Sequence, residues 1–246
     1  RDRSNEVNVV ESGFRSTDWQ QLTFAVVGMG LIGGSYAKAL RRLGVKKIIG
    51  VDTDGKVLRQ AQEQAVIDEA LCGAGPGLQA ADVVICSVYP AATLDFVKSA
   101  VPFLKSDVLI TDATGIKGSL PEDVQRLLTG RMEFIAGHPM AGRQGSGLGM
   151  SQAEIFDGAN YIVVPAAFNS SGAIEWLSRF AVAIGCGQVV QVDAVEHDRI
   201  IAYTSNLPHA LAVALINSAS YNENTKYFIA GSFRDGTRVA DINPYL

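Results

Sequence analysis

Three histidines occur in the chain, and one of them, His138, has neighbours that favour chemistry over packing. It lies in the segment FIAGHPMAGRQGSG, residues 134–147, between small residues and a proline, where a packed core does not need an imidazole. Because an imidazole gains or loses its charge near neutral pH, His138 could accept a proton during a reaction. A structural histidine bonded to the backbone is the alternative. His197, which adjoins Asp198 at the start of a helical segment, is better interpreted as helix-start or domain-junction chemistry.

A polar cluster surrounds the third histidine, His209, in the segment YTSNLPHALAVALIN. On a helix, Ser205 and Asn206 would share a stripe with His209, while the leucines would form another stripe. Pro208 removes one backbone hydrogen bond and is expected to kink the helix there. A kink beside a polar cluster favours a ligand-facing surface, and a helix end frayed by the proline is the alternative.

Two arginines near the end of the chain could bind an anion. Arg234 and Arg238, in SFRDGTRVA, are four residues apart and would share one face of a helix. A guanidinium presents a fixed fork of donors that matches a carboxylate, so this pair is a candidate for binding an acidic substrate. A solvated ion pair with Asp235 is the alternative.

The motif GMGLIG has three glycines, Gly28, Gly30 and Gly33, between a strand-like apolar run and a run with helical spacing. This spacing with these flanks is typical of a dinucleotide-binding loop. The first glycine permits a tight turn, the second lets the backbone approach a pyrophosphate, and the third lets helix and strand pack closely. The phosphates would then lie at the helix N-terminus, where free N–H groups and the dipole favour negative charge. The alternative, glycines that only make a turn, does not explain the acidic residue that follows.

That acidic residue is Asp52, which ends the second strand-like run, 24 residues after Gly28. A carboxylate there can accept hydrogen bonds from both ribose hydroxyls and would repel a 2′-phosphate, and its neighbours Thr53 and Asp54 offer no arginine. The sequence therefore predicts NAD rather than NADP. The residues that we assign to cofactor binding are Gly28, Gly30, Leu31, Ile32, Gly33, Asp52 and Ser87.

Strand-like and helix-like segments alternate along the part of the chain that contains the glycine loop, Asp52 and His138. Strands are predicted at residues 22–28, 46–52, 81–88, 106–113, 132–139, 160–165 and 187–193. Helices are predicted at residues 31–44, 54–65, about 89–103, 120–128 and 171–185. This alternation predicts an α/β fold: a Rossmann-like, doubly wound, mainly parallel sheet covered on both faces.

The alternation stops near Val192, and only helical patterns follow. We expect a polar N-terminal extension at residues 1–21, an NAD-binding domain at 22–192 and a helical substrate and dimerisation domain at 193–246. The last part has only 54 residues, too few for a robust core of its own, so its apolar faces need a partner. We therefore predict a homodimer formed through this region.

The composition excludes several classes of protein. The net charge is −4, 48% of the residues are hydrophobic, and no basic run suggests nucleic acid or a membrane surface. No apolar run is long enough to span a bilayer, and no signal peptide is recognised. The three cysteines are odd in number and lack metal-ligand spacing, so neither a disulfide framework nor a metal site is indicated. We expect a cytoplasmic protein that acts on a small molecule.

Several motifs occur in a fixed order from about Thr23 to the end of the chain: VVGMGLIGGSYAKAL, TDATGIKG, GHPMAGRQGSG, IFDGANYIVVP, EHD, SNLPHA and FRDGTRVADINP. In these motifs the chain resembles the prephenate/arogenate dehydrogenase family of tyrosine biosynthesis. The resemblance implies NAD-dependent oxidative decarboxylation of a dicarboxylate. Prephenate would give 4-hydroxyphenylpyruvate, and arogenate would give tyrosine.

Site roles follow from the resemblance, motif by motif. His138 would accept the proton of the substrate's C4 hydroxyl as hydride leaves that carbon. His209 would orient the substrate, Arg238 would bind a substrate carboxylate, and Ser205 would help line the pocket. Oxidising an alcohol needs such a proton acceptor beside the hydride donor carbon.

Some positions depart from the pattern of the relatives. Gly115 stands where many relatives have the serine of D-x-G-S-x-K, and Thr114 is the candidate substitute for that hydroxyl. Gln144 stands where a glutamate is common, near the expected substrate side chain, and Asn206 stands where a histidine is common. These changes bear on the choice between prephenate and arogenate more than on the reaction. Relatives also continue into further helices, so we expect further residues after Leu246.

Two other interpretations remain at this point. Another dehydrogenase of the same architecture, such as a β-hydroxyacid dehydrogenase or an imine reductase, would share the glycine loop but lack the paired GHPMAG and SNLPHA segments. A nucleotide-binding regulator without turnover is the other, and the departures at Gly115 and Gln144 are the reason to keep it as an alternative.

Overall fold

The computed structural model describes residues 18–143 and 145–240 of the 246-residue chain. The chain divides into two compact units, the first ending at Ala194 and the second beginning at Val195. The first unit contains the sheet, and the described part of the second consists of helices and turns.

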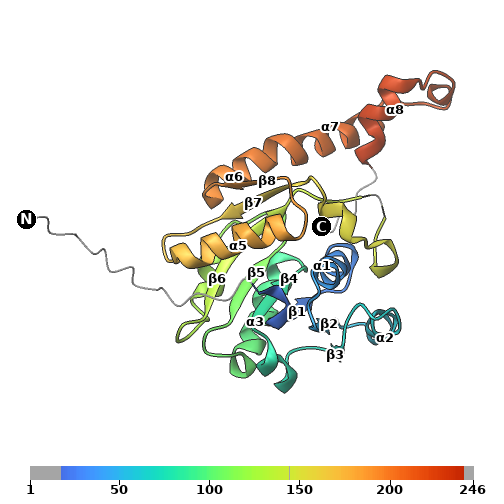
Figure 1. Cartoon of the computed structure of the whole chain (residues 1–246). Helices are drawn as coiled ribbons and strands as arrows, with labels where there is room; N and C mark the ends of the chain where they lie inside the picture. Colours follow the sequence, from blue (N-terminus) through green and yellow to red (C-terminus); the bar gives the residue numbers. More distant parts are fainter. Residues whose placement is uncertain (1–17, 144, 241–246) are drawn as a thin grey trace, which may run out of the picture. The chain divides into compact units, whose positions relative to one another are not determined.

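Eight strands form one sheet in the first unit, in the order β3-β2-β1-β4-β5-β6-β7-β8 (Figure 1). All neighbouring strands are parallel except β6 and β7, which are antiparallel. The mainly parallel sheet predicted from the sequence is therefore confirmed. The strands are β1 Thr23–Val27, β2 Lys47–Val51, β3 Glu69–Leu71, β4 Val83–Cys86, β5 Leu109–Asp112, β6 Glu133–Pro139, β7 Asn160–Val164 and β8 Gln188–Gln191.

Two features of the sheet were not predicted. Strand β3 has three residues, Glu-Ala-Leu, too few for a periodic signal. Between β6 and β7 the described chain forms only short 3-10 turns, at Leu148–Met150 and Ala153–Phe156. A parallel pair needs a long crossover, usually a helix, so β7 returns beside β6 in the antiparallel direction.

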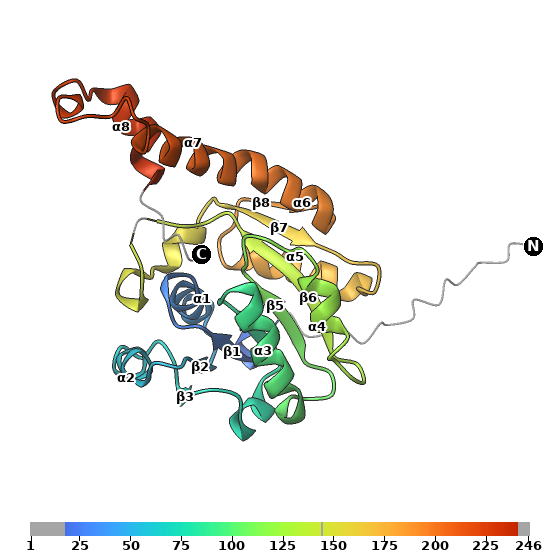
Figure 2. The same cartoon turned by 180° about the vertical axis from the view of Figure 1, so that it is seen from behind.

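Helices cover both faces of the sheet. One face packs against α1, α2 and α5 in a core that includes Phe24, Trp176 and Phe180. The other face packs against α3 and α4, with Val97 and Val124 in its core. Both helices are labelled in Figure 2, which shows the molecule from behind. The bounds are α1 Leu31–Arg42, α2 Gly55–Glu63, α3 Pro90–Ala100, α4 Leu120–Gln125 and α5 Ser171–Ala183.

The helix predicted at residues 120–128 is shorter than expected. It ends at Gln125, and the next residues continue as tight turns, with Leu127 N–H bonded to Val124 O at 2.9 Å. The N-cap predicted at Asp54 is confirmed, since its side chain accepts a hydrogen bond from Lys56 N at 2.8 Å.

The second unit is built from α6 Ala194–Ile201, a π-helical segment Ala202–Asn206, α7 Leu207–Ile216 and α8 Gly231–Thr237. The disturbance expected at Pro208 takes the form of this π-helical segment, which directly precedes the turn that contains the proline. A proline lacks the N–H that an α-helix needs, and a π-turn is one way in which a helix absorbs that loss.

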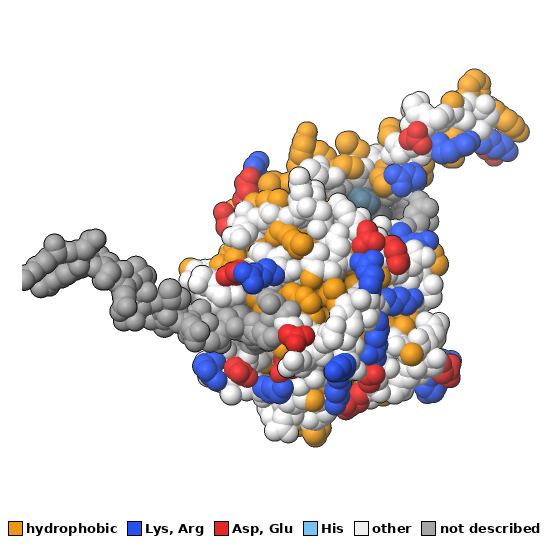
Figure 3. Space-filling view, viewed as in Figure 1, with side chains coloured by type: hydrophobic (Ala, Val, Ile, Leu, Met, Phe, Trp, Pro, Cys, Tyr) orange, Lys and Arg blue, Asp and Glu red, His pale blue; other side chains and the backbone are white. Residues whose placement is uncertain are grey.

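Large apolar side chains of the second unit are exposed, and Figure 3 shows hydrophobic groups gathered along its helices. The exposed residues are Val195, Ile200, Tyr203, Leu207, Leu211, Leu215, Ile216, Tyr221, Tyr227 and Phe228. Among the described residues, none of the helices combines the length and apolar character that crossing a bilayer requires.

Candidate active site

The glycine loop joins the end of β1 to the start of α1. Gly28 has a φ of +84°, and a Cβ there would lie 2.5 Å from Val88 Cγ1. A Cβ at Gly33 would lie 1.8 Å from Gly28 O, so both positions accept only glycine. Gly30 is the N-cap of α1, and a Cβ there would meet nothing within 4 Å. The loop therefore presents an open approach to the N-terminus of a twelve-residue helix.

Asp52 is held at the end of β2 by two backbone donors. Its Oδ2 accepts a hydrogen bond from Met29 N at 2.7 Å, and its Oδ1 accepts one from Asp54 N at 2.9 Å. The first bond comes from the glycine loop itself. The carboxylate is thereby fixed beside that loop, with lone pairs left for further donors.

A cavity of about 570 Å³ opens beside the glycine loop. Its wall comes from the loop, the end of β2, the segment after β4, the segment after β5, and Gly145–Gly147. The residues assigned from the sequence that line it are Gly28, Gly30, Leu31, Ile32, Asp52, Ser87 and Thr114. Gly33 lies beneath the loop instead, against Gly28.

Ser87 follows β4, and its hydroxyl oxygen is buried without a hydrogen-bond partner among the described residues. A buried hydroxyl without a partner loses about 1–3 kcal/mol relative to a satisfied one. Because Ser87 also lines the cavity, a bound polar ligand or water could satisfy it.

His138 lies on β6 and is half-buried; it is not among the residues that line this cavity, but it lies beside one of them. A Cβ added to Gly115, which lines the cavity, would lie 3.9 Å from both Cε1 and Nε2 of the imidazole. The imidazole therefore lies beside the part of the cavity wall that Gly115 forms. Gln144, assigned to substrate binding, lies outside the described residues.

Thr114 lines the cavity, but its hydroxyl is engaged in a buried network. The hydroxyl donates a hydrogen bond to Asp112 Oδ2 and accepts one from Lys117 Nζ at 3.2 Å. A side chain used in this way is not free to replace the serine hydroxyl that Gly115 lacks.

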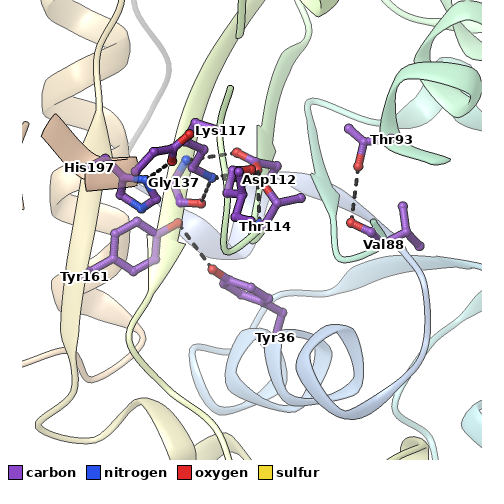
Figure 4. Close-up of polar contacts among 11 residues, drawn as sticks. Tyr36, Val88, Thr93, Asp112, Thr114, Lys117, Gly137, Tyr161 and His197 are labelled. Carbon is purple, nitrogen blue, oxygen red and sulfur yellow. Dashed lines mark hydrogen bonds and ion pairs between the residues drawn. The ribbon is translucent and has the colours of Figure 1, made fainter. Parts of the chain in front are cut away.

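Two functional candidates were missed from the sequence: Asp112 and Lys117, both fully buried. Lys117 Nζ lies 2.7 Å from Asp112 Oδ2, and both side chains also bond the backbone of Gly137, the residue before His138 (Figure 4). The signal was the spacing in TDATGIKG, where a lysine follows the aspartate that ends a buried strand by five residues.

A second buried polar pair joins α1 to β7. The hydroxyls of Tyr36 and Tyr161 are 3.2 Å apart, and neither side chain is exposed (Figure 4). Burial raises the pKa of both phenols above the usual value, and the charge of Asp112 adds to the rise for Tyr161. Both groups therefore stay protonated and neutral over the working range of the protein.

Ser205, His209 and Arg238 belong to the second unit. His209 Nδ1 lies 2.6 Å from Ser205 O. Because a carbonyl can only accept, this contact requires the proton on Nδ1 and leaves Nε2 of the neutral ring as an acceptor. Arg238 is exposed just after α8, and the roles of these three residues stay predictions.

Metal ligands do not gather in the described part of the chain, where no group of three or more His, Cys, Asp or Glu side chains could hold an ion. Cys72 is exposed and Cys86 and Cys186 are buried, all as free thiols.

Two family models match the chain. The nucleotide-binding domain of prephenate dehydrogenase matches residues 36–190, and the dimerization domain of prephenate dehydrogenase matches residues 193–246. The chain belongs to the prephenate dehydrogenase family. This membership decides against the β-hydroxyacid dehydrogenase and imine reductase alternatives.

Individual members of the prephenate dehydrogenase family are similar over most of the chain. The prephenate dehydrogenase of Bacillus subtilis (strain 168) is 32% identical over 230 residues, which are 91% of this chain and 62% of that protein. The crystal structure of prephenate dehydrogenase from A. aeolicus in complex with hydroxyphenyl propionate and NAD+ has a TM-score of 0.82 at 30% identity and covers 91% of this chain and 79% of that one. The crystal structure of Synechocystis arogenate dehydrogenase has a TM-score of 0.78 at 28% identity and covers 91% and 81%. The chain thus spans less than two thirds of the B. subtilis relative.

Proposed function

We propose that the protein catalyses the NAD-dependent oxidative decarboxylation of prephenate to 4-hydroxyphenylpyruvate, of arogenate to tyrosine, or of both. The observation that carries this proposal is the imidazole of His138 beside Gly115, a residue that lines the cavity next to the glycine loop. Family membership supplies the reaction class.

The residues around the glycine loop fit NAD. Gly30 leaves the N-terminus of α1 open to a pyrophosphate, and the fixed carboxylate of Asp52 can accept hydrogen bonds from the ribose hydroxyls. Ser87 offers an unsatisfied hydroxyl in the same cavity. Bound NAD+ would supply the acceptor for the hydride that leaves C4 of the substrate.

His138 would act as the general base. Its imidazole takes the proton of the C4 hydroxyl while the C–H bond at C4 breaks. The C–OH group thereby becomes a carbonyl, and its oxygen does not carry a full negative charge during this step. The bond from the ring to its carboxylate then breaks and CO2 leaves. The electron pair of that bond moves through the ring to the carbonyl oxygen, so that the ring becomes aromatic and the oxygen becomes a phenolate. His138 returns its proton to the new phenol oxygen, which balances the reaction.

The second unit would supply the donors that hold the substrate. Arg238 binds a carboxylate through its guanidinium, and the Nε2 acceptor of His209 receives a hydrogen bond from the substrate side chain. Ser205 and Gln144 would contact the substrate as well, whereas Thr114 would line the cavity with its hydroxyl still bonded to Asp112. Such dicarboxylates need fixed cations, and an arginine fork matches a carboxylate better than a lysine does.

We also infer a homodimer formed by the second unit and a cytoplasmic location. The exposed side chains of Tyr203, Leu207 and Leu211 form apolar surface of the kind that protein interfaces cover. Light scattering should give the mass of two chains, and Leu211→Asp should shift it toward one chain, because a charge would be buried in the interface. A single-chain mass for the unmodified protein would reject the dimer. Three free cysteines suit a reducing compartment.

One assay tests the main proposal: formation of NADH from NAD+, measured side by side with prephenate and with arogenate. We expect at least one substrate to give NADH and CO2 in equal amounts. Binding of NAD+ without turnover of either substrate would favour the nucleotide-binding regulator instead.

A further inference from the structure

Both backbone hydrogen-bonding groups of Gly137 are bonded by buried charged side chains. Its N–H donates to Asp112 Oδ1 at 3.1 Å, and its carbonyl accepts from Lys117 Nζ at 2.6 Å (Figure 4). The two side chains bond each other at 2.7 Å, and neither is exposed. A closed ring of hydrogen bonds therefore joins the end of β5 to the residue before His138.

This ring replaces a missing piece of strand. The ladder between β5 and β6 ends at Thr111 and Ile135. Gly137 faces the same edge of β6 as Ile135, because backbone groups repeat with a period of two. Beyond Asp112 the chain leaves the sheet and forms the cavity wall with Thr114 and Gly115. Asp112 and Lys117 bond the N–H and carbonyl of Gly137 that β5 no longer pairs with. The two strands can therefore separate where the cavity opens.

The Cα of Gly137 is covered by a side chain from β7. A Cβ at Gly137 would lie 2.4 Å from the hydroxyl oxygen of Tyr161. Gly137 also pairs with Val163 in the antiparallel ladder between β6 and β7. The residue before His138 is therefore fixed at its N–H, at its carbonyl and at its Cα.

We propose that Asp112 and Lys117 are positioning residues that set the direction of the His138 imidazole; this inference rests on the proposed function. A fully buried ion pair contributes little net stability compared with a packed apolar pair. What this pair provides is orientation, since it bonds the peptide groups on both sides of Gly137, the second of which joins Gly137 to His138. A displacement of about 1 Å at a catalytic group can lower the rate roughly a hundredfold.

The decisive experiment is a double replacement that removes both charges together, Asp112→Asn with Lys117→Met, so that no unpaired charge is left in the core. It is made in the unmodified protein and in the His138→Asn variant. We expect kcat to fall roughly ten- to a hundredfold in the first background, with KM and NAD+ affinity within about threefold. In the His138→Asn background kcat should not fall further, because the pair acts through the imidazole, which this background lacks.

A matched control and an assay-free measurement accompany it. Glu175→Gln with Arg179→Met removes an exposed ion pair on α5, whose side chains are 62% and 60% exposed, and should leave kcat and the imidazole spectra unchanged. Imidazole resonances of the three histidines are recorded by NMR and assigned with His138→Asn. The replacement of Asp112 and Lys117 should shift or broaden the His138 signal and leave His209 unchanged.

Equal loss of kcat in both backgrounds, or an unmoved His138 resonance, would overturn the inference. If the double replacement fails to bind NAD+ or to fold, Lys117→Arg keeps the charge but alters the geometry, and the same readouts apply: an unmoved His138 signal again overturns it. A failure of the proposed function can be told apart from a failure of this inference. In the first case the unmodified protein would make no NADH, while the NMR comparison would still show whether Asp112 and Lys117 position the His138 imidazole.

Discussion

The two units of the molecule treat their apolar side chains in opposite ways. The sheet unit buries Phe24, Trp176 and Phe180 in one of two cores that cover both faces of its sheet. In the described part of the helical unit, Ile201 and Ala212 are the buried hydrophobic residues, while Phe228 is 84% exposed. The first unit therefore has the core of an independent domain, whereas the second needs another surface to cover it.

The same contrast extends to the polar groups. In the sheet unit, Asp52, Asp112 and Gly137 are fixed by backbone bonds and burial before any ligand arrives. In the helical unit, Arg238 is exposed on a long side chain. We expect changes in the sheet unit to alter chemistry and cofactor choice, and changes in the helical unit to alter substrate binding and assembly.

The largest effect should come from His138→Asn in the sheet unit. Loss of the proton acceptor should lower kcat by about 10²- to 10⁴-fold while leaving NAD+ affinity unchanged. Initial rates and a cofactor titration measure the two quantities. Unchanged turnover would remove His138 from the mechanism.

Arg238→Ala tests the helical unit and should have the next largest effect. Loss of a charge-assisted hydrogen bond to a carboxylate should raise the substrate KM roughly ten- to a hundredfold, with little change in NAD+ affinity. Steady-state kinetics at varied substrate, beside the same cofactor titration, give both numbers. If NAD+ binding collapsed while KM held, Arg238 would belong to a different part of the site.

Asp52→Ala returns to the sheet unit and should change cofactor choice by about tenfold. The variant loses the acceptor for the ribose hydroxyls and the repulsion of a 2′-phosphate, so NAD+ should bind about tenfold more weakly and NADP+ should gain relative to it. The ratio of kcat/KM for the two cofactors is the measurement, and an unchanged ratio would contradict the role. Glu63→Gln, on the exposed side of α2, is a control that should leave the ratio as it is.

Gly115→Ser should have the smallest effect, a rise in kcat of about two- to fivefold. The φ of Gly115 lies outside the left-handed region, and the nearest side-chain atoms to its Cβ would be those of His138 at 3.9 Å, so serine fits without strain. Its hydroxyl could then bond the imidazole or the substrate, an interaction of about 1 kcal/mol. Stopped-flow or steady-state kinetics compare kcat of the two proteins. A loss of activity would mean that the open space beside Gly115 is itself needed.

Most of the sheet could be predicted because buried parallel strands are short apolar runs, as in Thr23–Val27 and Val83–Cys86. The glycine loop and Asp52 could be predicted because their spacing along the chain reflects a local turn. The network at Gly137 could not, since it joins Asp112 to a residue 25 positions away, across two strands. The engagement of the Thr114 hydroxyl was hidden for a different reason: its partner Lys117 is near in sequence, but the burial of both residues depends on the whole sheet.

The contact between Gly137 and Tyr161 also restricts the order in which this protein could change during evolution. A side chain at position 137 would collide with the Tyr161 hydroxyl, so Tyr161 would have to shrink first. That earlier step would leave the buried hydroxyl of Tyr36 without its partner, which lies 3.2 Å away. Positions 36, 137 and 161 are thus coupled, and we expect viable sequences to exchange them together rather than one at a time.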